Sequence, residues 1–279
     1  MRFSTLILFV CAIRLVGQST APQQTETVQE LVSRLTPPQK AVYDEAAQAF
    51  GAMRFPESLT AFKKLLEQLP GDPVLSKFTA EAALNTDGSS SYALTLLKPV
   101  AAADANDWQA AALLTRACAE TGDSSCRDAG MAHMLELHQK GVIPGNITQY
   151  IIERVAVGDN TLVIWTSTVP WGRYKVYDLA QVIDKNKTTV LRLTLESNDI
   201  DQVQFANEHP KEAAAGVRRF SYDGYSPGPV NANGQPTQSH STYEMFDGQP
   251  SYTAVREKFI TIVKGQQKAL TRHSYPVAQ

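Results

Sequence analysis

The first half of the chain carries apolar side chains every three or four positions, the spacing that places them on one face of a helix. Turn residues such as Pro70-Gly71 and Asp87-Gly88 interrupt the pattern. Thr36, followed by Pro37 and by Gln39, is typical of a helix start. We therefore expect helices in pairs over 37–51 and 56–69, 73–86 and 90–102, and 107–120 and 124–140.

These helices repeat with a fixed period. Two sets of small or helix-starting residues each recur 34 positions apart, namely Ala49, Ala83 and Ala117, and Pro56, Ser90 and Ser124. A single hairpin of this length cannot bury its apolar face alone, so neighbouring hairpins stack. Small side chains let two helix axes approach to about 8–10 Å. The positions expected at such contacts are Ala46, Ala49, Ala80, Ala83 and Ala117.

After Gly145 the apolar period changes to two, which indicates strands. Leu191, Leu193 and Leu195 should face the core, while Thr194 and Glu196 should face solvent, as in a sheet with one wet side. Turn residues separate four such segments, so we expect a four-stranded antiparallel meander. The expected strands are 149–157, 161–169, 173–184 and 188–196.

The rest of the second half alternates between helical and irregular patterns. Residues 198–208 and 250–264 are predicted helices that cover the sheet, and 217–222 is a further strand candidate. Residues 226–241 are rich in Pro, Gly, Asn, Gln and Ser and are expected to form a flexible loop, with a lid or a partner-binding segment as the alternatives. Residues 266–279 are expected to form a tail.

Length, composition and charge limit the number of domains and the classes of partner. The chain has 279 residues, 26 of them basic and 28 acidic, with 43% hydrophobic residues. This length suits two packed domains. The expected fold class is an N-terminal three-hairpin α-solenoid over 36–141, followed by an α+β domain over 149–265 with an antiparallel sheet covered by helices. Neither half carries a basic patch, so nucleic acid is not an expected partner.

The N-terminus is typical of a secretory signal peptide, with Arg2 followed by a short apolar run through Cys11. We expect cleavage after Gly17, which removes 1–17 and leaves 18–35 as a linker or short helix. An uncleaved anchor is the alternative. No later apolar run reaches the roughly 18 residues of a membrane span. The mature protein is therefore expected to be periplasmic or extracellular, with no membrane span.

Cys118 and Cys126 are the cysteines that remain after signal removal, and they flank the predicted turn Thr121-Gly122-Asp123. In an oxidising compartment we expect them to form a disulfide that staples two antiparallel helices. A redox role is the alternative reading. It lacks the two-residue spacing that is typical of such pairs.

Two segments carry a resemblance to the tetratricopeptide repeat family. Residues 53–70 follow the second helix of that repeat and its terminal proline, and Ala119-Glu120-Thr121-Gly122-Asp123 is a common form of its mid-repeat turn. The resemblance covers 36–141, although the second repeat departs from the pattern at Pro99. It implies stacked first helices that line a groove for an extended peptide or a protein terminus.

The resemblance also implies which side chains face such a groove. Each of them has an alternative reading as an ordinary helix surface residue. Trp108 is either a packing residue or an amphipathic anchor for a partner. The groove candidates are Lys40, Tyr43, Lys77, Glu81, Asn85, Trp108 and Thr115.

Little of the sequence points to catalysis or to metal binding. His133 and His138 are five residues apart on one helix, so they cannot share an ion as a four-residue step would. His209, His240 and His273 lie in separate segments without a recognisable catalytic motif. We expect no metal and no cofactor, although convergent catalytic sites need not show in sequence order.

Eight of the ten tyrosines lie in 150–279. Most of them suit half-buried strands. Trp171, Tyr222 and Tyr225 are the candidates for an exposed face that stacks on a ligand.

Three functional hypotheses remain open. The first is an exported, non-enzymatic scaffold that binds a protein or peptide partner through the helical groove. The second is a C-terminal domain that binds or hydrolyses a small molecule, with the repeats as a targeting arm. The third is purely structural: the repeats pack on the sheet, and neither the groove nor the loop is open to a ligand.

Overall fold

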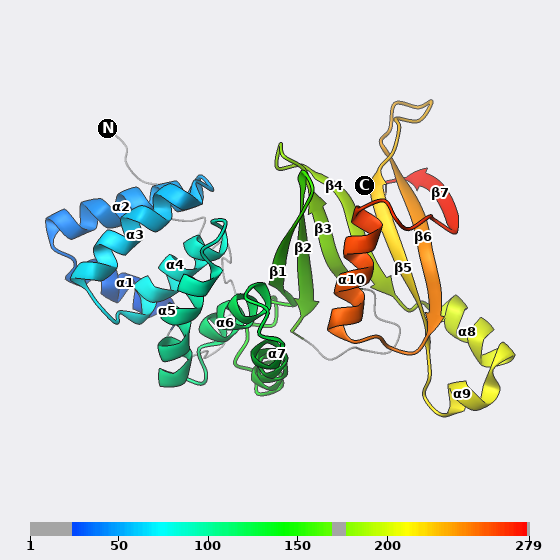
Figure 1. The fold of residues 1–279 in the computed structure, drawn as a ribbon, viewed down its shortest axis with the longest axis horizontal. Coiled ribbons are helices and arrows are strands. Elements are labelled where there is room, and N and C mark those ends of the chain that lie inside the picture. Colours follow the sequence, from blue (N-terminus) through cyan, green and yellow to red (C-terminus); the bar gives the residue numbers. More distant parts are fainter. Residues whose placement is uncertain (1–23, 169–176, 278–279) are drawn as a thin grey trace. The chain divides into compact units, whose positions relative to one another are not determined.

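The computed structural model describes residues 24–168 and 177–277. The chain divides into two compact units, 1–146 and 147–279, each of which is described by itself. The first unit is helical, and the second is an antiparallel sheet with helices (Figure 1). This confirms the expected α+β layout. The predicted signal peptide, 1–17, lies outside the described residues.

The helical unit contains three consecutive helix hairpins, as the apolar period predicts. A further helix precedes them, so the expected linker over 18–35 includes a helix. The described helices of this unit are α1 (Gln24–Arg34), α2 (Pro37–Gly51), α3 (Phe55–Gln68), α4 (Pro73–Leu84), α5 (Ser90–Ala103), α6 (Trp108–Glu120) and α7 (Ser124–Gln139).

Local capping explains where several of these helices begin. The backbone N–H of Thr36 donates to Gln39 Oε1 at 3.0 Å, which starts α2. The Asp72 carboxylate accepts from the backbone N–H of Leu75 at the start of α4, and Asp107 does the same at the start of α6. Each cap satisfies a backbone donor that has no partner inside its helix.

Alanine contacts hold the hairpins together. All five predicted close-approach alanines, Ala46, Ala49, Ala80, Ala83 and Ala117, are buried. Ala46, Ala80, Ala83 and Ala117 join one core with larger side chains such as Phe62, Leu65 and Leu75. Pro99 does not end its helix. Helix α5 continues past it to Ala103, and the proline is exposed. Cys118 and Cys126 are joined by a disulfide between α6 and α7.

The second unit is a seven-stranded meander in which each strand pairs antiparallel with the next in sequence. Among the described residues, no helix is both long and apolar enough to cross a bilayer. The strands are β1 (Gln149–Val157), β2 (Asn160–Ser167), β3 (Tyr177–Ile183), β4 (Thr189–Glu196), β5 (Arg219–Pro227), β6 (Thr237–Asp247) and β7 (Thr271–Pro276).

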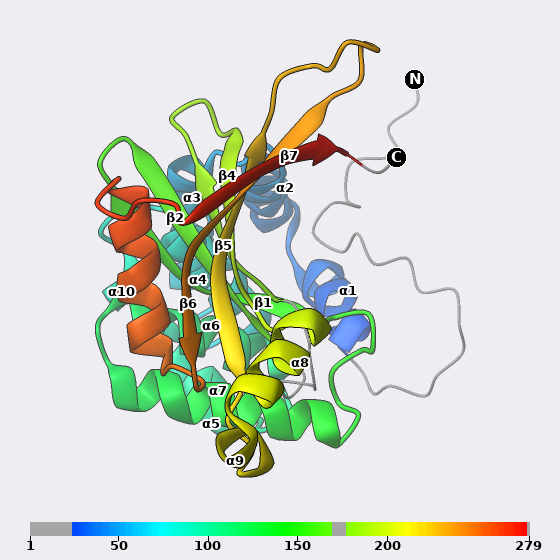
Figure 2. The ribbon, with the colours of Figure 1, turned by 90° about the vertical axis from the view of Figure 1, so that its right-hand side faces the viewer.

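The predicted four-stranded meander is present as β1 to β4, and the strand candidate 217–222 overlaps β5. Two other expectations for this unit were wrong, because the described residues contain two further strands. Residues 226–241, predicted to be a flexible loop, contain the end of β5 and the start of β6, and the predicted tail over 266–279 contains β7. Strand pairing uses backbone groups, so Ser, Gln, His and Thr can fill a strand without the apolar pattern that signals one. Figure 2 shows β5, β6 and β7 lying side by side.

Three helices complete the unit: α8 (Asp199–Glu208), α9 (Pro210–Ala214) and α10 (Tyr252–Val263). Helix α10 covers the apolar side of the sheet, where the Phe259 ring meets Tyr222 edge-on at 5.9 Å. Leu193 and Leu195 are buried there, as predicted. Thr194, predicted to face solvent, is only 1% exposed. The opposite side of the sheet therefore contains buried polar groups.

Candidate functional site

The side of the sheet opposite α10 carries polar residues on four neighbouring strands. Alternate residues of a strand share one side, and the register aligns Thr194 with Asp223, Tyr225 with His240, and His240 with His273. We call this set the polar face. It comprises Thr194 and Glu196 on β4, Ser221, Asp223 and Tyr225 on β5, His240 and Thr242 on β6, and His273 and Tyr275 on β7.

Asp223 is the centre of the polar face and is only 2% exposed. Its Oδ1 accepts from His240 Nε2 at 2.8 Å and from the Thr242 hydroxyl at 2.6 Å. Its Oδ2 accepts from the Ser221 hydroxyl. Three donors thus offset the cost of removing this carboxylate from water.

The His240 ring is held in one orientation. It stacks on the Tyr225 ring, with centroids 4.6 Å apart and an angle of 6° between the ring planes, and its Nε2 is hydrogen-bonded to Asp223. Its second nitrogen, Nδ1, has no hydrogen-bond partner within the described residues and is not a buried atom. A fixed imidazole therefore presents one nitrogen to solvent.

A second carboxylate lies beside this pair. Glu196 Oε1 accepts from the Tyr225 hydroxyl and from the Thr194 hydroxyl, each at 2.7 Å. Burial, the hydrogen bond to Glu196 and the negative charges of Glu196 and Asp223 raise the pKa of Tyr225 above its ordinary value. Burial and the same two charges raise the pKa of Tyr275. Two carboxylates therefore act on the tyrosines of the polar face.

The hydrogen-bond directions favour binding over nucleophilic catalysis. The hydroxyls of Ser221 and Thr242 donate to Asp223, not to the imidazole. A serine or threonine nucleophile needs its hydroxyl on the base that removes the proton. The polar face therefore has a positioned histidine and carboxylate without a paired nucleophile among these hydroxyls.

The three predicted ligand-stacking residues have different outcomes. Tyr225 belongs to the polar face. Tyr222 does not, because it is buried under α10 with its ring stacked 5.1 Å from Phe246. Trp171 lies outside the described residues.

Two of the groove candidates in the helical unit are core residues, so they were wrong as partner contacts. Tyr43 is buried with its ring 6.1 Å from Phe62. Thr115 is fully buried, and its hydroxyl donates to the Ala111 carbonyl at 2.7 Å. It packs so closely on Gly130 that a Cβ at that glycine would lie 2.2 Å from Thr115 Oγ1.

Lys77 is also engaged inside the helical unit. Its ammonium pairs with Asp107 at 2.6 Å, and both side chains are nearly buried. Because Asp107 also caps α6, this contact ties α4 to the start of α6.

Glu81 and Asn85 lie around the buried Arg116. The Arg116 guanidinium donates to Asn85 Oδ1 at 3.3 Å. Burial raises the pKa of Glu81, and the charge of Arg116 opposes that rise. These side chains therefore serve internal contacts.

Helix α1 occupies further surface on the helical unit. It lies against α4, with Leu31 fully buried and Arg34 paired with the α4 cap residue Asp72. The remaining groove candidates are more accessible. Lys40 is exposed beside Asp44, and Trp108 is half-buried at the first position of α6.

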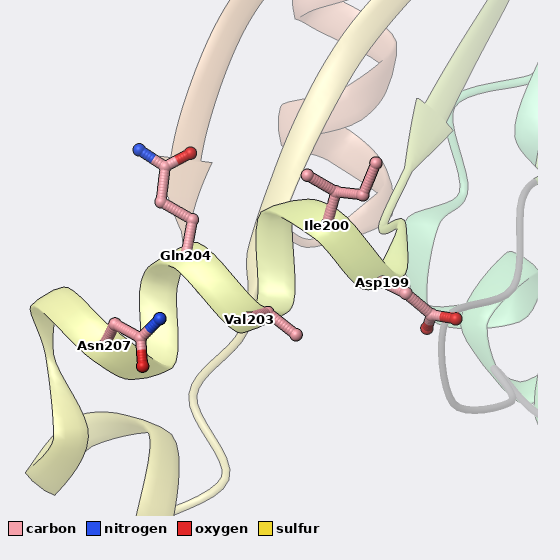
Figure 3. A pocket seen from close by; sticks show the side chains of 5 residues that line it. All are labelled: Asp199, Ile200, Val203, Gln204 and Asn207. Carbon is pink, nitrogen blue, oxygen red and sulfur yellow. The ribbon is translucent and has the colours of Figure 1, made fainter.

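A shallow hollow follows the outer side of α8 (Figure 3). Ile200 and Val203 project from that helix and are 79% and 62% exposed. All the described residues that line the hollow come from this one helix, and they include no pair of charged side chains. They are Asp199, Ile200, Val203, Gln204 and Asn207.

The sequence indicated Tyr225 as a stacking candidate and His240 as a histidine without a motif, and it did not join the two. It missed Asp223 and the positioning residues Glu196, Ser221 and Thr242. The alternation of Ser221, Asp223 and Tyr225 along β5 is the one local signal for part of this set. His209 is not part of the site, because it is exposed and stacks on Phe205.

Comparison with known proteins found no matching family model, no similar curated protein and no similar solved structure.

Proposed function

We propose that the C-terminal unit is a non-enzymatic binding module for a small polar ligand, and that the ligand binds on the polar face. The observation that carries this proposal is the buried Asp223, which fixes His240 with a nitrogen toward solvent. The three donors around Asp223 hold its carboxylate in place, and the carboxylate in turn holds the His240 ring.

The chemistry of the polar face favours a hydroxyl-rich ligand. Glu196 and Asp223 place carboxylate acceptors on the face. Hydroxyl groups donate to carboxylates and also accept from imidazole and phenol donors. Tyr275, 36% exposed on β7, offers a ring face for stacking.

The test is a titration with glucose, N-acetylglucosamine and their oligomers in the presence of EDTA. We expect at least one of these saccharides to raise the melting temperature of the wild type and to bind measurably by calorimetry. Tyr275→Ala, an edge-strand variant, should weaken that binding at least fivefold without lowering the melting temperature of the free protein. Val203→Ala, at an exposed position on α8 outside the polar face, is the control. The absence of saccharide binding, or equal binding by Tyr275→Ala, would contradict the proposal.

A protein or peptide partner of the helical unit is the second candidate. The observation in its favour is Trp108, which is half-buried at the start of α6 in a position to anchor a partner. We expect Trp108→Ala to reduce the partner recovered from the native compartment at least fivefold, with Lys98→Ala on α5 as the control. Equal recovery with both variants would remove this candidate.

A further inference from the structure

We propose that His240 and His273 form a transition-metal site on the polar face. The two residues lie directly opposite each other on β6 and β7, and their ring centroids are 6.3 Å apart. Imidazole nitrogen is a ligand that Zn²⁺, Ni²⁺ and Cu²⁺ accept readily. The site goes beyond the binding proposed above, because it does not require an organic ligand.

His240 is already arranged as a metal ligand. Its Nε2 lies on Asp223 Oδ1 at 2.8 Å, so the proton is held on that nitrogen and the lone pair lies on Nδ1. A carboxylate on the second nitrogen is the usual partner of a metal-binding histidine, where it fixes the tautomer and the ring orientation. Asp223 is fixed in turn by Ser221 and Thr242.

The second imidazole can reach the same ion. Zinc lies about 2.0–2.1 Å from each imidazole nitrogen, so two ligand nitrogens on one ion are about 3.4 Å apart. Opposite residues of an antiparallel pair have Cβ atoms about 4.5–5.5 Å apart. His273 is exposed, so its ring can rotate toward Nδ1 of His240 without moving the backbone.

Two protein ligands leave coordination positions for water or for an added ligand. The described residues contain no group of three His, Cys, Asp or Glu side chains placed to hold a metal. The site therefore binds an exchangeable ion rather than a permanently enclosed one, because closed structural sites use four protein ligands.

The experiment is calorimetry on untagged full-length protein with ZnCl₂ and, separately, NiCl₂ at pH 7.5. We expect one ion per chain for the wild type. His273→Ala should weaken binding at least tenfold, and this exposed edge position can be changed without unfolding the sheet. Asp223→Asn should weaken binding by about 10- to 100-fold through loss of the positioning carboxylate. His209→Ala, an exposed histidine outside the site, should bind as the wild type does.

Two results would overturn the proposal. One is the absence of measurable binding by the wild type at 1 mM metal. The other is equal affinity and stoichiometry in His273→Ala and the wild type. Neither result bears on the saccharide titration, which is performed in EDTA and uses Tyr275→Ala, so the two proposals can fail separately.

Discussion

Arg116→Met is expected to lower the free energy of unfolding of the helical unit by about 3–5 kcal/mol, because it leaves buried carboxylates without their cation. Arg116 Nε donates to Glu120 Oε1 at 2.7 Å, and a second guanidinium nitrogen donates to the Leu84 carbonyl at 2.5 Å. Glu120 also accepts from Ser90 at 2.7 Å. The guanidinium thus ties α6 to the end of α4 and, through Glu120, to the start of α5.

The measurement is urea unfolding, monitored by the circular dichroism signal at 222 nm. Lys98→Met, which removes an exposed cation from α5, should change the free energy of unfolding by less than about 0.5 kcal/mol. Arg116→Met/Glu120→Gln should recover part of the loss, because one buried charge is removed with the other. A loss below 1 kcal/mol for Arg116→Met would contradict this account.

The same variant should show a characteristic pH dependence. Burial already raises the folded-state pKa of Glu81, and Arg116 opposes that rise. A carboxyl group whose folded-state pKa is raised costs stability above that pKa, and the cost disappears as pH falls and the group binds a proton. Without Arg116 the cost grows, so the deficit of Arg116→Met should be larger at pH 7 than at pH 4.5. A deficit that is constant with pH would contradict the role assigned to Glu81.

Arg256→Met is expected to lower the free energy of unfolding of the sheet unit by about 3 kcal/mol, for the same physical reason. Glu153 on β1 is buried, and its two oxygens accept from Arg256 Nε at 3.0 and 2.8 Å and from a second guanidinium nitrogen at 2.8 Å. The hydrogen bonds to Glu153 raise the pKa of Arg256 above its ordinary value. In Arg256→Met, the Tyr252 hydroxyl, 3.1 Å from Glu153 Oε2, is the donor from α10 that Glu153 keeps.

Near-ultraviolet circular dichroism during urea unfolding reports this loss. Lys264→Met, an exposed position just after α10, is the matched control. Because the two units have separate interiors, Arg256→Met should leave the transition of the helical unit unchanged, and Arg116→Met should leave that of the sheet unit unchanged. Equal shifts of both transitions in either variant would show that the units unfold together, and unchanged stability in Arg256→Met would contradict the importance of the ion pair.

Prediction from sequence worked where neighbouring residues decide the structure. The start of α2 depends on a cap residue within three positions, and that cap was predicted from Thr36 and Gln39. The caps Asp72 and Asp107 act over the same short range at the starts of α4 and α6. The burial of the alanines was predicted from the helical spacing of apolar residues, which is a local pattern. The strands rich in polar residues were missed, because β6 and β7 depend on backbone pairing with neighbouring strands, which no local pattern reports.

The candidate site needed the tertiary structure. His240 and Asp223 are 17 residues apart, and only the β5–β6 register brings them into contact. Tyr43 and Thr115 look like groove residues on an isolated helix, but packing on Phe62 and Gly130 buries them. The sequence by itself determined the helices, their repeat and the division of the chain, since these follow from periodicity and short-range caps. The tertiary structure decided which polar side chains meet, because hydrogen bonds and ion pairs form between groups that are distant along the chain and close only after folding.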